Sequence, residues 1–526
     1  MEKEKIVKKR EKHSAKADVM HSFISLRRRV VVDGILVGII AGLVSIAYRL
    51  TLGYIGHISE TVYAAARQNM WLIPLIFSGL AALGLAVGIL VKLVPLSSGS
   101  GIPQVQGEVL GVVNMKPWRL IGAKFLGGSL ANLGGLSLGR EGPSIQLGAA
   151  AGKLVSQILK RDNNEERYLI SAGASAGLAA AFNAPISGTL FTLEEMHKNF
   201  APLLLIPSLL ASVTADYVSK NVFGLAPVFS FTVKETLPLK LYGWLIVLGI
   251  FCGMVGVVFN FMLLKGQDIY AKLPLKKEYW PIIAFVAAAV FGLIFPYVLG
   301  GGHELMENLA EHPATIGFLL LILGLKIFFT SVSYGSGAQG GIFLPVLVIG
   351  GVTGAIFLES GAYFNWIPAE FYINFIIFAM AGVLTGVIRS PILSVLLVTE
   401  MTGSFLHISS LSVVVITAYL TAELLKSKPI YESLLERLLH GLHAEDKDRP
   451  HLARALSEFY IRVGSTIDGK AIKDINGPEH SLIVGLYRGG EEIVPQGDTV
   501  IRGGDRIIVL CNDDQLYDIK HYYNNV

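Results

Sequence analysis

One acidic residue, Glu141, lies in a stretch that is otherwise apolar and rich in glycine. Gly139 and Arg140 precede it, and Gly142 and a proline follow it. A carboxylate is costly to hold inside a lipid bilayer, and ionisable residues there usually line the path of an ion. The sequence therefore predicts that Glu141 is a proton-accepting gate in an anion pathway.

Three glycine-rich turns each precede an apolar helical stretch: residues 99–103, 139–143 and 340–345. The start of a helix leaves backbone N–H groups without partners and carries a partial positive charge, so it can hold an anion without any Lys or Arg. Glycine lets the backbone approach the ion closely, and partial charges let the ion leave again. The alternative is that Gly and Pro only permit helix ends and close helix packing in a bilayer.

The composition predicts a polytopic helical membrane protein. Of 526 residues, 52% are hydrophobic and only 16% are charged, against about 25% charged in an ordinary soluble domain. Several apolar runs approach the ~20 residues that cross a bilayer. The basic segment 1–29 is expected to be a solvated, partly disordered arm on the cytoplasmic side. The two cysteines predict neither a disulfide framework nor a metal site.

The apolar region, residues 30–436, contains an internal repeat. Pro185 and Glu194 match Pro391 and Glu400, and Glu195 falls opposite a methionine. The turns at 99–100 and 139–143 match 301–302 and 341–345 at nearly the same offset of about 200 residues. We expect two repeats, roughly 30–220 and 240–436, that are inverted so that interrupted helices converge on one point. Residues 437–451 are predicted to be a linker.

The motifs together resemble those of the CLC chloride channel and transporter family. They are GSGIP (99–103), GREGP (139–143), AAAFNAP (179–185), FTLEEM (191–196), GGIFLP (340–345) and KPIY (428–431). The resemblance implies an all-α CLC fold with inverted repeats and broken helices. It also implies that a central chloride is bound by the hydroxyls of Ser100 and Tyr431 and by the amides of Ile342 and Phe343. Amides around Arg140, Glu141 and Gly142 would hold a more external anion.

The resemblance gives the two acidic residues different roles. Glu141 resembles the external gate, whose carboxylate occupies an anion position until it is protonated or displaced. Glu195 resembles the internal glutamate of proton-coupled exchangers, while Glu194 and Glu400 are expected to be structural or water-facing. The predicted function is an antiporter that exchanges two chloride ions for one proton, with no enzymatic activity and no cofactor beyond bound chloride. A passive chloride channel is the alternative, and a membrane-anchored sensor linked to potassium transport is a further one.

Three polar positions affect selectivity and the local field. Fluoride-selective relatives usually alter the serine of the first turn, and nitrate-selective relatives tend to carry proline there, so the retained Ser100 favours chloride. Gln104 and Gln106 stand where many relatives carry acids. Lys124, an intramembrane cation, is therefore expected either to pair with another acid or to shift toward neutrality.

Residues 452–526 read as a small α+β domain. Strands are predicted at 459–463, 481–487 and 506–511, with a tight turn at 488–491 and a helix at 513–522. The segment resembles a TrkA-C (RCK C-terminal) domain, which implies a cytoplasmic, dimeric module that binds a ligand such as the cyclic dinucleotide c-di-AMP; a module that only stabilises the dimer is the alternative. We expect a homodimer in a bacterial inner membrane, with both termini cytoplasmic and no nucleic-acid partner.

Overall fold

The computed structural model describes residues 2–229, 231, 236–445, 454–462, 464–475, 477–478, 481–488, 491–512, 519 and 522–523. The chain forms two compact units, Met1–Val105 with Met115–Leu434 and Gln106–Asn114 with Leu435–Val526. The second unit thus includes a short segment, Gln106–Asn114, that the sequence assigned to the membrane domain.

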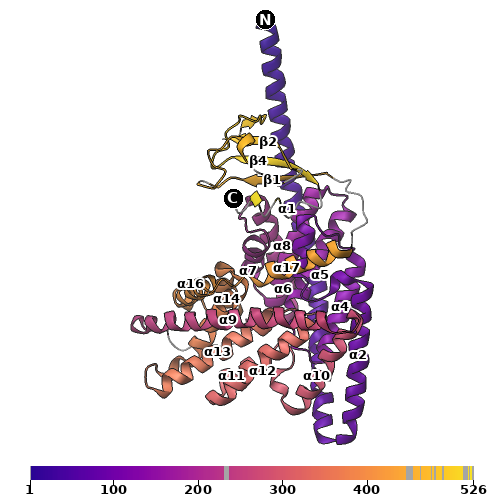
Figure 1. Ribbon diagram of the computed structural model, residues 1–526, viewed down its shortest axis with the longest axis vertical. Helices are drawn as coiled ribbons and strands as arrows, with labels where there is room; N and C mark the ends of the chain where they lie inside the picture. Colours follow the sequence, from indigo (N-terminus) through magenta and orange to yellow (C-terminus); the bar gives the residue numbers. More distant parts are fainter. Residues whose placement is uncertain are drawn as a thin grey trace. The chain divides into compact units, whose positions relative to one another are not determined.

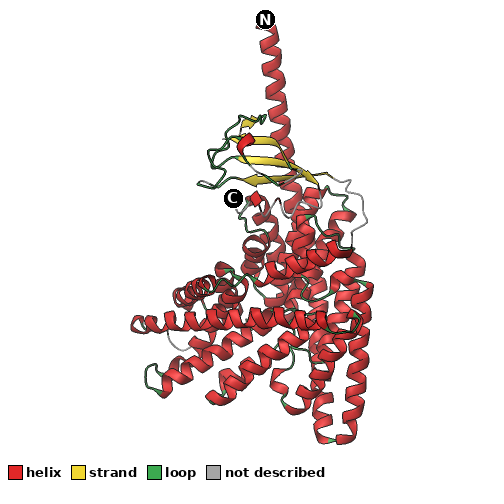
Figure 2. Cartoon of the chain, in the orientation of Figure 1, coloured by secondary structure: helices red, strands yellow, loops and turns green. Residues whose placement is uncertain are grey.

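The described part of the first unit is built from helices and loops, and the named strands of the described chain belong to the second unit (Figures 1 and 2). The helices are α1 (Glu2–Gln68), α2 (Ile73–Leu93), α3 (Ile102–Leu110), α4 (Pro117–Leu133), α5 (Glu141–Ile158), α6 (Asn163–Phe182), α7 (Pro185–Leu190), α8 (Pro202–Phe223), α9 (Tyr242–Lys272), α10 (Trp280–Ile294), α11 (His303–Glu311), α12 (Ile316–Gly335), α13 (Phe343–Tyr363), α14 (Tyr372–Ile388), α15 (Pro391–Thr402), α16 (Ile408–Leu424) and α17 (Ile430–Glu445). Helices α3 and α17 pass from one unit into the other.

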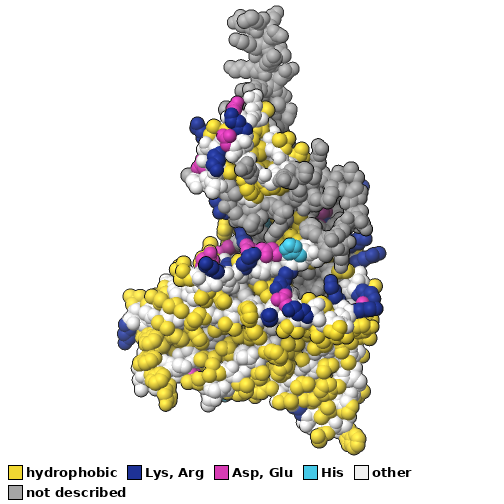
Figure 3. All heavy atoms as spheres, in the orientation of Figure 1, with side chains coloured by type: hydrophobic (Ala, Val, Ile, Leu, Met, Phe, Trp, Pro, Cys, Tyr) yellow, Lys and Arg dark blue, Asp and Glu magenta, His cyan; other side chains and the backbone are white. Residues whose placement is uncertain are grey.

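Nine helical segments within the described chain are long and apolar enough to span a membrane, which agrees with the predicted class. Figure 3 shows a broad band of hydrophobic side chains over the first unit, with charged side chains gathered along one margin. Helix α1 begins at Glu2, so the arm that was expected to be partly disordered is helical. Helix α17 continues to Glu445, into the segment that the sequence predicts to be a linker.

Glycines bring α5 and α6 into close contact. A Cβ atom on Gly148 would lie 2.2 Å from the carbonyl oxygen of Gly173, and one on Gly177 would lie 2.1 Å from that of Ser144. Small residues of this kind let helix backbones approach each other in a membrane, where apolar burial alone gives no net attraction. Helix α5 is consequently buried from its first residue to Ser156, so its N-terminus lies inside the protein.

The second unit contains an antiparallel sheet in the order β1-β4-β2-β3. Its strands are β1 (Arg454–Tyr460), β2 (Leu482–Arg488), β3 (Glu491–Ile493) and β4 (Arg506–Asn512). The β2–β3 hairpin pairs Arg488 with Glu491, which confirms the predicted tight turn. The core is formed by residues such as Phe459, Leu486 and Ile507.

The first predicted strand was misplaced. It was expected at 459–463, but β1 ends at Tyr460 because its partner β4 begins at Arg506, opposite Tyr460. Beyond that point the chain turns through Gly464, whose φ is 78°. The predicted helix at 513–522 falls largely outside the described residues; Ile519 within it and Tyr523 directly after it pack in the core.

Candidate functional site

The three glycine-rich turns meet in the interior of the first unit. The N–H of Gly139 donates to the carbonyl of Gly341 and the N–H of Gly341 donates to that of Gly139, both at 2.7 Å, so that the pair forms an antiparallel bridge. The N–H of Gly340 donates to the carbonyl of Gly99 at 3.0 Å. The matching turns of the two repeats therefore run in opposite directions and contact the first turn, as inverted repeats require.

The three turns can approach each other this closely because their glycines have no side chains. A Cβ atom on Gly142 would lie 2.9 Å from the Cβ and carbonyl oxygen of Ser100, and one on Gly341 would lie 2.9 Å from the amide nitrogen of Gly142. Gly101 also has a φ of +88°, in the left-handed region that glycine adopts readily. Ser100 is thereby placed directly against the start of α5.

The two helices that begin at these turns present their N-termini to the same region. Arg140 is the residue before α5 and Glu141 its first residue, while Ile342 and Phe343 occupy the same positions at α13. The first amides of a helix have no carbonyl partner within it and lie at the positive end of its dipole. The structure thus brings two positive helix ends together next to Ser100.

Two tyrosines complete the polar surroundings of Ser100. The hydroxyl of Tyr334 donates to the hydroxyl of Ser100 at 3.5 Å. Tyr431, near the start of α17, is fully buried, its hydroxyl lacks a hydrogen-bond partner in the described chain, and it lies within electrostatic range of Tyr334 and Glu141. A buried hydroxyl without a partner is costly, so this O–H is free to donate to an anion. Tyr334 was not predicted, because a tyrosine in an apolar helix carries no distinctive signal.

Glu141 is fully buried at the first turn of α5. Both carboxylate oxygens lack a hydrogen-bond partner within the described chain, and Oε1 lies 3.9 Å from Nε of Arg140. The backbone amides of Glu141 itself and of Leu344 interact with the carboxylate electrostatically, outside hydrogen-bond geometry. An acidic group at the positive ends of two helices is stabilised as an anion there, yet it has no fixed partner that would keep it in place.

Glu195 occupies a separate buried position, in a short π-helix at Phe191–Met196 that continues from α7. Its carboxylate accepts a hydrogen bond from the hydroxyl of Ser390 and interacts electrostatically with Lys198. Lys198 itself pairs with Glu432 of α17, one residue after Tyr431. Glu195 is therefore buried but close to charged residues at the protein surface.

Glu194 and Glu400 each cap the N-terminus of a helix in the opposite repeat. Glu194 accepts hydrogen bonds from the amides of Ile392 and Leu393, at 3.0 and 2.6 Å, at the start of α15. Glu400 accepts them from the amides of Ile186 and Ser187, at 3.1 and 2.8 Å, at the start of α7. Each carboxylate satisfies orphan amides at a helix N-terminus. Both residues thus have the structural position that was one of the two expectations for them.

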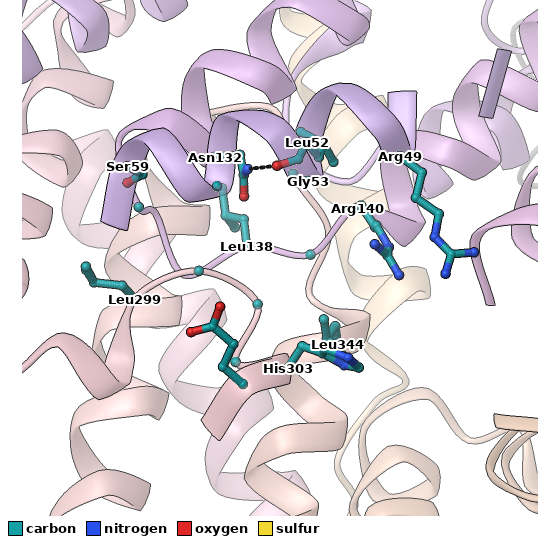
Figure 4. A pocket seen from close by; sticks show the side chains of 18 of the residues that line it. Arg49, Leu52, Gly53, Ser59, Asn132, Leu138, Arg140, Leu299, His303 and Leu344 are labelled. Atoms are coloured by element: carbon teal, nitrogen blue, oxygen red, sulfur yellow. Dashed lines mark hydrogen bonds between the residues drawn. The ribbon is translucent and has the colours of Figure 1, made fainter. Parts of the chain in front are cut away.

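A cavity of about 720 Å³ leads to Glu141. Its walls come from the second half of α1, the turns at 135–141 and 299–303, and the loop that follows α8. In Figure 4 the side chains of Arg49 and Arg140 extend side by side into this space, with His303 and Leu344 across from them. The cavity gives the buried carboxylate a route to one side of the first unit.

Comparison with known proteins establishes the family. The family model for voltage gated chloride channels matches residues 83–423. The chain belongs to the CLC family. A second model, for the TrkA-C domain, matches residues 456–524 of this CLC protein.

Relatives and solved structures agree with this membership. The chain is 32% identical over 450 residues to the H(+)/Cl(-) exchange transporter ClcA of Vibrio cholerae, covering 82% of this chain and 95% of the relative. It is 32% identical over 432 residues to ClcA of Salmonella typhimurium, covering 80% and 90%. Among solved structures it resembles a slow cyanobacterial Cl-/H+ antiporter (TM-score 0.73, 29% identity, 80% and 99% covered) and a CLC-type fluoride/proton antiporter (0.65, 25%, 77% and 97%). The predicted CLC fold is confirmed.

Two buried lysines of this CLC chain stabilise the turns. Nζ of Lys124 donates to the carbonyls of Ser97 and Gly99, at 2.9 and 2.6 Å, and no described carboxylate lies within ion-pair distance of it. Of the two alternatives that the sequence left open for Lys124, pairing with an acid is therefore excluded among the described residues. Lys326, its counterpart in the second repeat, donates to the carbonyls of Val298 and Gly300. The repeat offset could have identified Lys326 from the sequence, and the sequence analysis missed it.

Proposed function

We propose that this chain exchanges chloride for protons across a bacterial inner membrane, in the two-to-one ratio that its resemblance implies. Support comes from the relatives of similar length, which are named as H(+)/Cl(-) exchange transporters, and from the Cl-/H+ antiporter among the similar structures. It acts as a transporter and not as an enzyme.

The observation that carries the proposal is the position of Glu141. Its carboxylate is buried at the positive ends of α5 and α13, where an anion is stabilised, and it accepts no hydrogen bond from the described residues. A carboxylate is itself a small anion, so it competes with chloride for the same amides. Protonation removes its charge and its hold on the site. Proton uptake and chloride entry are thereby linked at one position.

The chloride ligands we propose are the residues gathered at the three turns. The hydroxyls of Ser100 and Tyr431 and the amides of Ile342 and Phe343 would bind a central chloride. A second chloride would be bound by the amides around Arg140 and Gly142 whenever the Glu141 carboxylate has left. These donors carry partial charges only, which favours release as well as binding.

Glu195 is proposed to pass protons between Glu141 and the cytoplasm. It is buried, hydrogen-bonded to the hydroxyl of Ser390, and near the surface pair formed by Lys198 and Glu432. This charged pair is the proposed entry point for a proton from the cytoplasm. The matching residue of the second repeat, Met401, cannot carry a proton.

Chloride is the favoured anion. Ser100 is present in the first turn, where fluoride-selective relatives usually carry another residue. The structural similarity to a fluoride/proton antiporter supports the exchange mechanism more than the anion, because the two chains share only 25% identity.

The C-terminal unit is proposed to regulate transport. The match to the TrkA-C model supports a ligand-sensing role, and c-di-AMP is the ligand class that the resemblance suggests. We further propose a homodimer with both termini in the cytoplasm. The basic residues before the first apolar run support that orientation of the N-terminus.

Paired flux measurements test the proposal. Purified protein would be reconstituted into liposomes under an outward chloride gradient while external chloride and pH are recorded together. We expect chloride efflux to drive protons inward against their own gradient. Chloride efflux without uphill proton movement would instead support a passive channel, which the family description also encompasses.

A further inference from the structure

Arg49 is a cation that the proposed mechanism does not use. It lies on α1, far along the sequence from the glycine-rich turns, and it lines the cavity that leads to Glu141. Its Nη1 donates to Oδ1 of Asn183 at 3.1 Å, and its guanidinium lies 3.9 Å from the ring centre of Phe223. These two contacts hold the head group in one orientation.

The remaining donors of Arg49 are not occupied by an acid. No described carboxylate lies within ion-pair distance of Arg49, although many other charged groups of the first unit are paired. An arginine has five N–H donors in a planar fork, and the bond to Asn183 uses one of them. The others are available to a ligand in the cavity.

A second guanidinium is placed beside the first. Arg140 lines the same cavity, interacts electrostatically with Arg49, and has a buried Nε without a hydrogen-bond partner in the described chain. Figure 4 shows the two head groups pointing into the same space. Two like charges near each other repel, and an anion close to both offsets that repulsion; the Glu141 carboxylate does so while it is charged, and a bound anion would do so once it is protonated.

Three acidic residues also line the cavity: Glu60 on the same helix as Arg49, Glu304 on α11, and Glu141. None of them lies within ion-pair distance of Arg49 in the described chain, whereas Oε1 of Glu141 lies 3.9 Å from Nε of Arg140. When Glu141 is protonated, neither guanidinium therefore has a charged carboxylate partner.

We propose that Arg49 and Arg140 form an outer binding site for a monovalent anion in the cavity, next to Glu141. The site recruits chloride from the side of the membrane to which the cavity opens and delivers it to the gate when Glu141 is protonated. With the N-terminus in the cytoplasm this is the external side, because the cavity is lined by the half of α1 that is remote from the N-terminus. The inference rests on the proposed chloride exchange and adds a binding step before it.

Chloride dependence measured separately on each side tests the site. Right-side-out and inside-out membrane vesicles present opposite faces, with ionic strength held constant by an impermeant anion. We expect Arg49→Gln to raise the half-saturating external chloride roughly five-fold, the effect of removing one nearby charge at intermediate dielectric. The internal value and the proton-to-chloride ratio should not change. Arg49→Lys should stay within about two-fold of the wild type because it keeps the charge.

Arg67 provides a matched control. It lies on the same helix and lines the same cavity, but its Nη1 donates to the carbonyl of Gly292. Arg67→Gln removes the same charge about 27 Å along α1 from Arg49 and should change the external value by less than about two-fold. If Arg67→Gln and Arg49→Gln raised the half-saturating external chloride equally, the effect would be a long-range electrostatic one, and the proposed outer site would be wrong.

A second variant covers the case in which Arg49→Gln does not fold. Asn183→Asp places a carboxylate against Arg49 and should raise the external half-saturation as Arg49→Gln does. If wild-type protein exchanges chloride for protons and neither Arg49→Gln nor Asn183→Asp changes the external value, the outer site is wrong and the proposed function stands. If wild-type protein shows no exchange, the proposed function itself fails.

Discussion

The two repeats build the same backbone around the site from different side chains. Gly139 and Gly341 pair with each other, and α5 and α13 begin two residues after them, at Glu141 and Phe343 respectively. The second acidic residue, Glu195, likewise has an apolar counterpart, Met401. The duplicated helix ends therefore provide a symmetric setting for an anion, while both groups proposed to carry the proton lie in the first repeat.

Structural polar residues, by contrast, are duplicated. Lys124 and Lys326 both bind backbone carbonyls of the turn that precedes their repeat's first half-helix. Glu194 and Glu400 both cap a helix of the opposite repeat. Residues present in both repeats thus make structural contacts, and the residues proposed to couple chloride to protons are present in one repeat only.

The largest effect is expected from Glu141→Ala. The substitution removes the carboxylate that competes with chloride, so proton movement should fall to the background of protein-free liposomes while chloride flux persists. Simultaneous chloride and pH recordings on the reconstituted protein measure both. Residual uphill proton movement would show that the asymmetry between Glu141 and Phe343 is not what couples the ions.

Glu195→Gln should also abolish proton coupling, with chloride flux retained. Glutamine keeps a side-chain oxygen for the hydroxyl of Ser390 but cannot exchange a proton. The matched change in the other repeat, Met401→Leu, conserves volume and should leave the proton-to-chloride ratio unchanged. The same flux assay distinguishes them, and equal loss in both variants would contradict the comparison.

The two buried lysines should be equivalent for stability and different for anion binding. Lys124→Met and Lys326→Met each leave carbonyls that lost a charged donor, which costs about 2 kcal/mol or more of unfolding free energy. Thermal unfolding in detergent measures this loss. Only Lys124→Met should also weaken chloride binding, measured by calorimetric titration, because Lys124 holds Gly99 next to Ser100.

Removing either capping glutamate should destabilise the protein without altering exchange. Glu194→Ala and Glu400→Ala each leave two helix-start amides unpaired, at a cost of about 1 kcal/mol. The unfolding temperatures of the two variants should decrease by similar amounts, and the proton-to-chloride ratio should stay at the wild-type value. A change of that ratio in Glu194→Ala alone would place Glu194 among the residues of the proton path.

The C-terminal unit lies outside the repeats and shows the smallest predicted effect. Burial opposes ionisation of Asp505, but the bidentate Arg488 and the amide of Arg502 outweigh it and hold the pKa of Asp505 below its usual range. A folded-state pKa below the unfolded value means that this stabilisation is present at neutral pH and is lost as the pH falls through the folded pKa. The protection factors for hydrogen exchange in β2 and β4 of the full chain, which correct for the slower intrinsic exchange at low pH, should decrease on acidification.

Asp505→Asn provides the control for that experiment. The variant should show lower hydrogen-exchange protection in these strands at neutral pH. Acidification should lower this protection less than it does in the wild type. An identical pH response in wild type and variant would assign the acid sensitivity of the unit to other groups.

The sequence by itself determined the class of the protein, the repeat, the family and the residues of the three turns. The length of an apolar run and the spacing of glycines are local properties, so they can be recognised without knowing how the helices pack. The β2–β3 turn was readable for the same reason. The limits of β1 were not, because a strand ends where its partner ends, and that partner lies far along the chain.

Only the tertiary structure decided what the buried charges contact. It showed that Lys124 binds carbonyls and not an acid, that Glu194 and Glu400 cap opposite repeats, and that Arg49 lies beside Arg140 in the cavity that leads to Glu141. Such partners depend on where helices cross in three dimensions. The spacing of Arg49 and Arg140 along the sequence does not predict that they lie near each other. The sequence shows only that a charged side chain in an apolar segment is unfavourable to bury. The fold determines which groups compensate that charge.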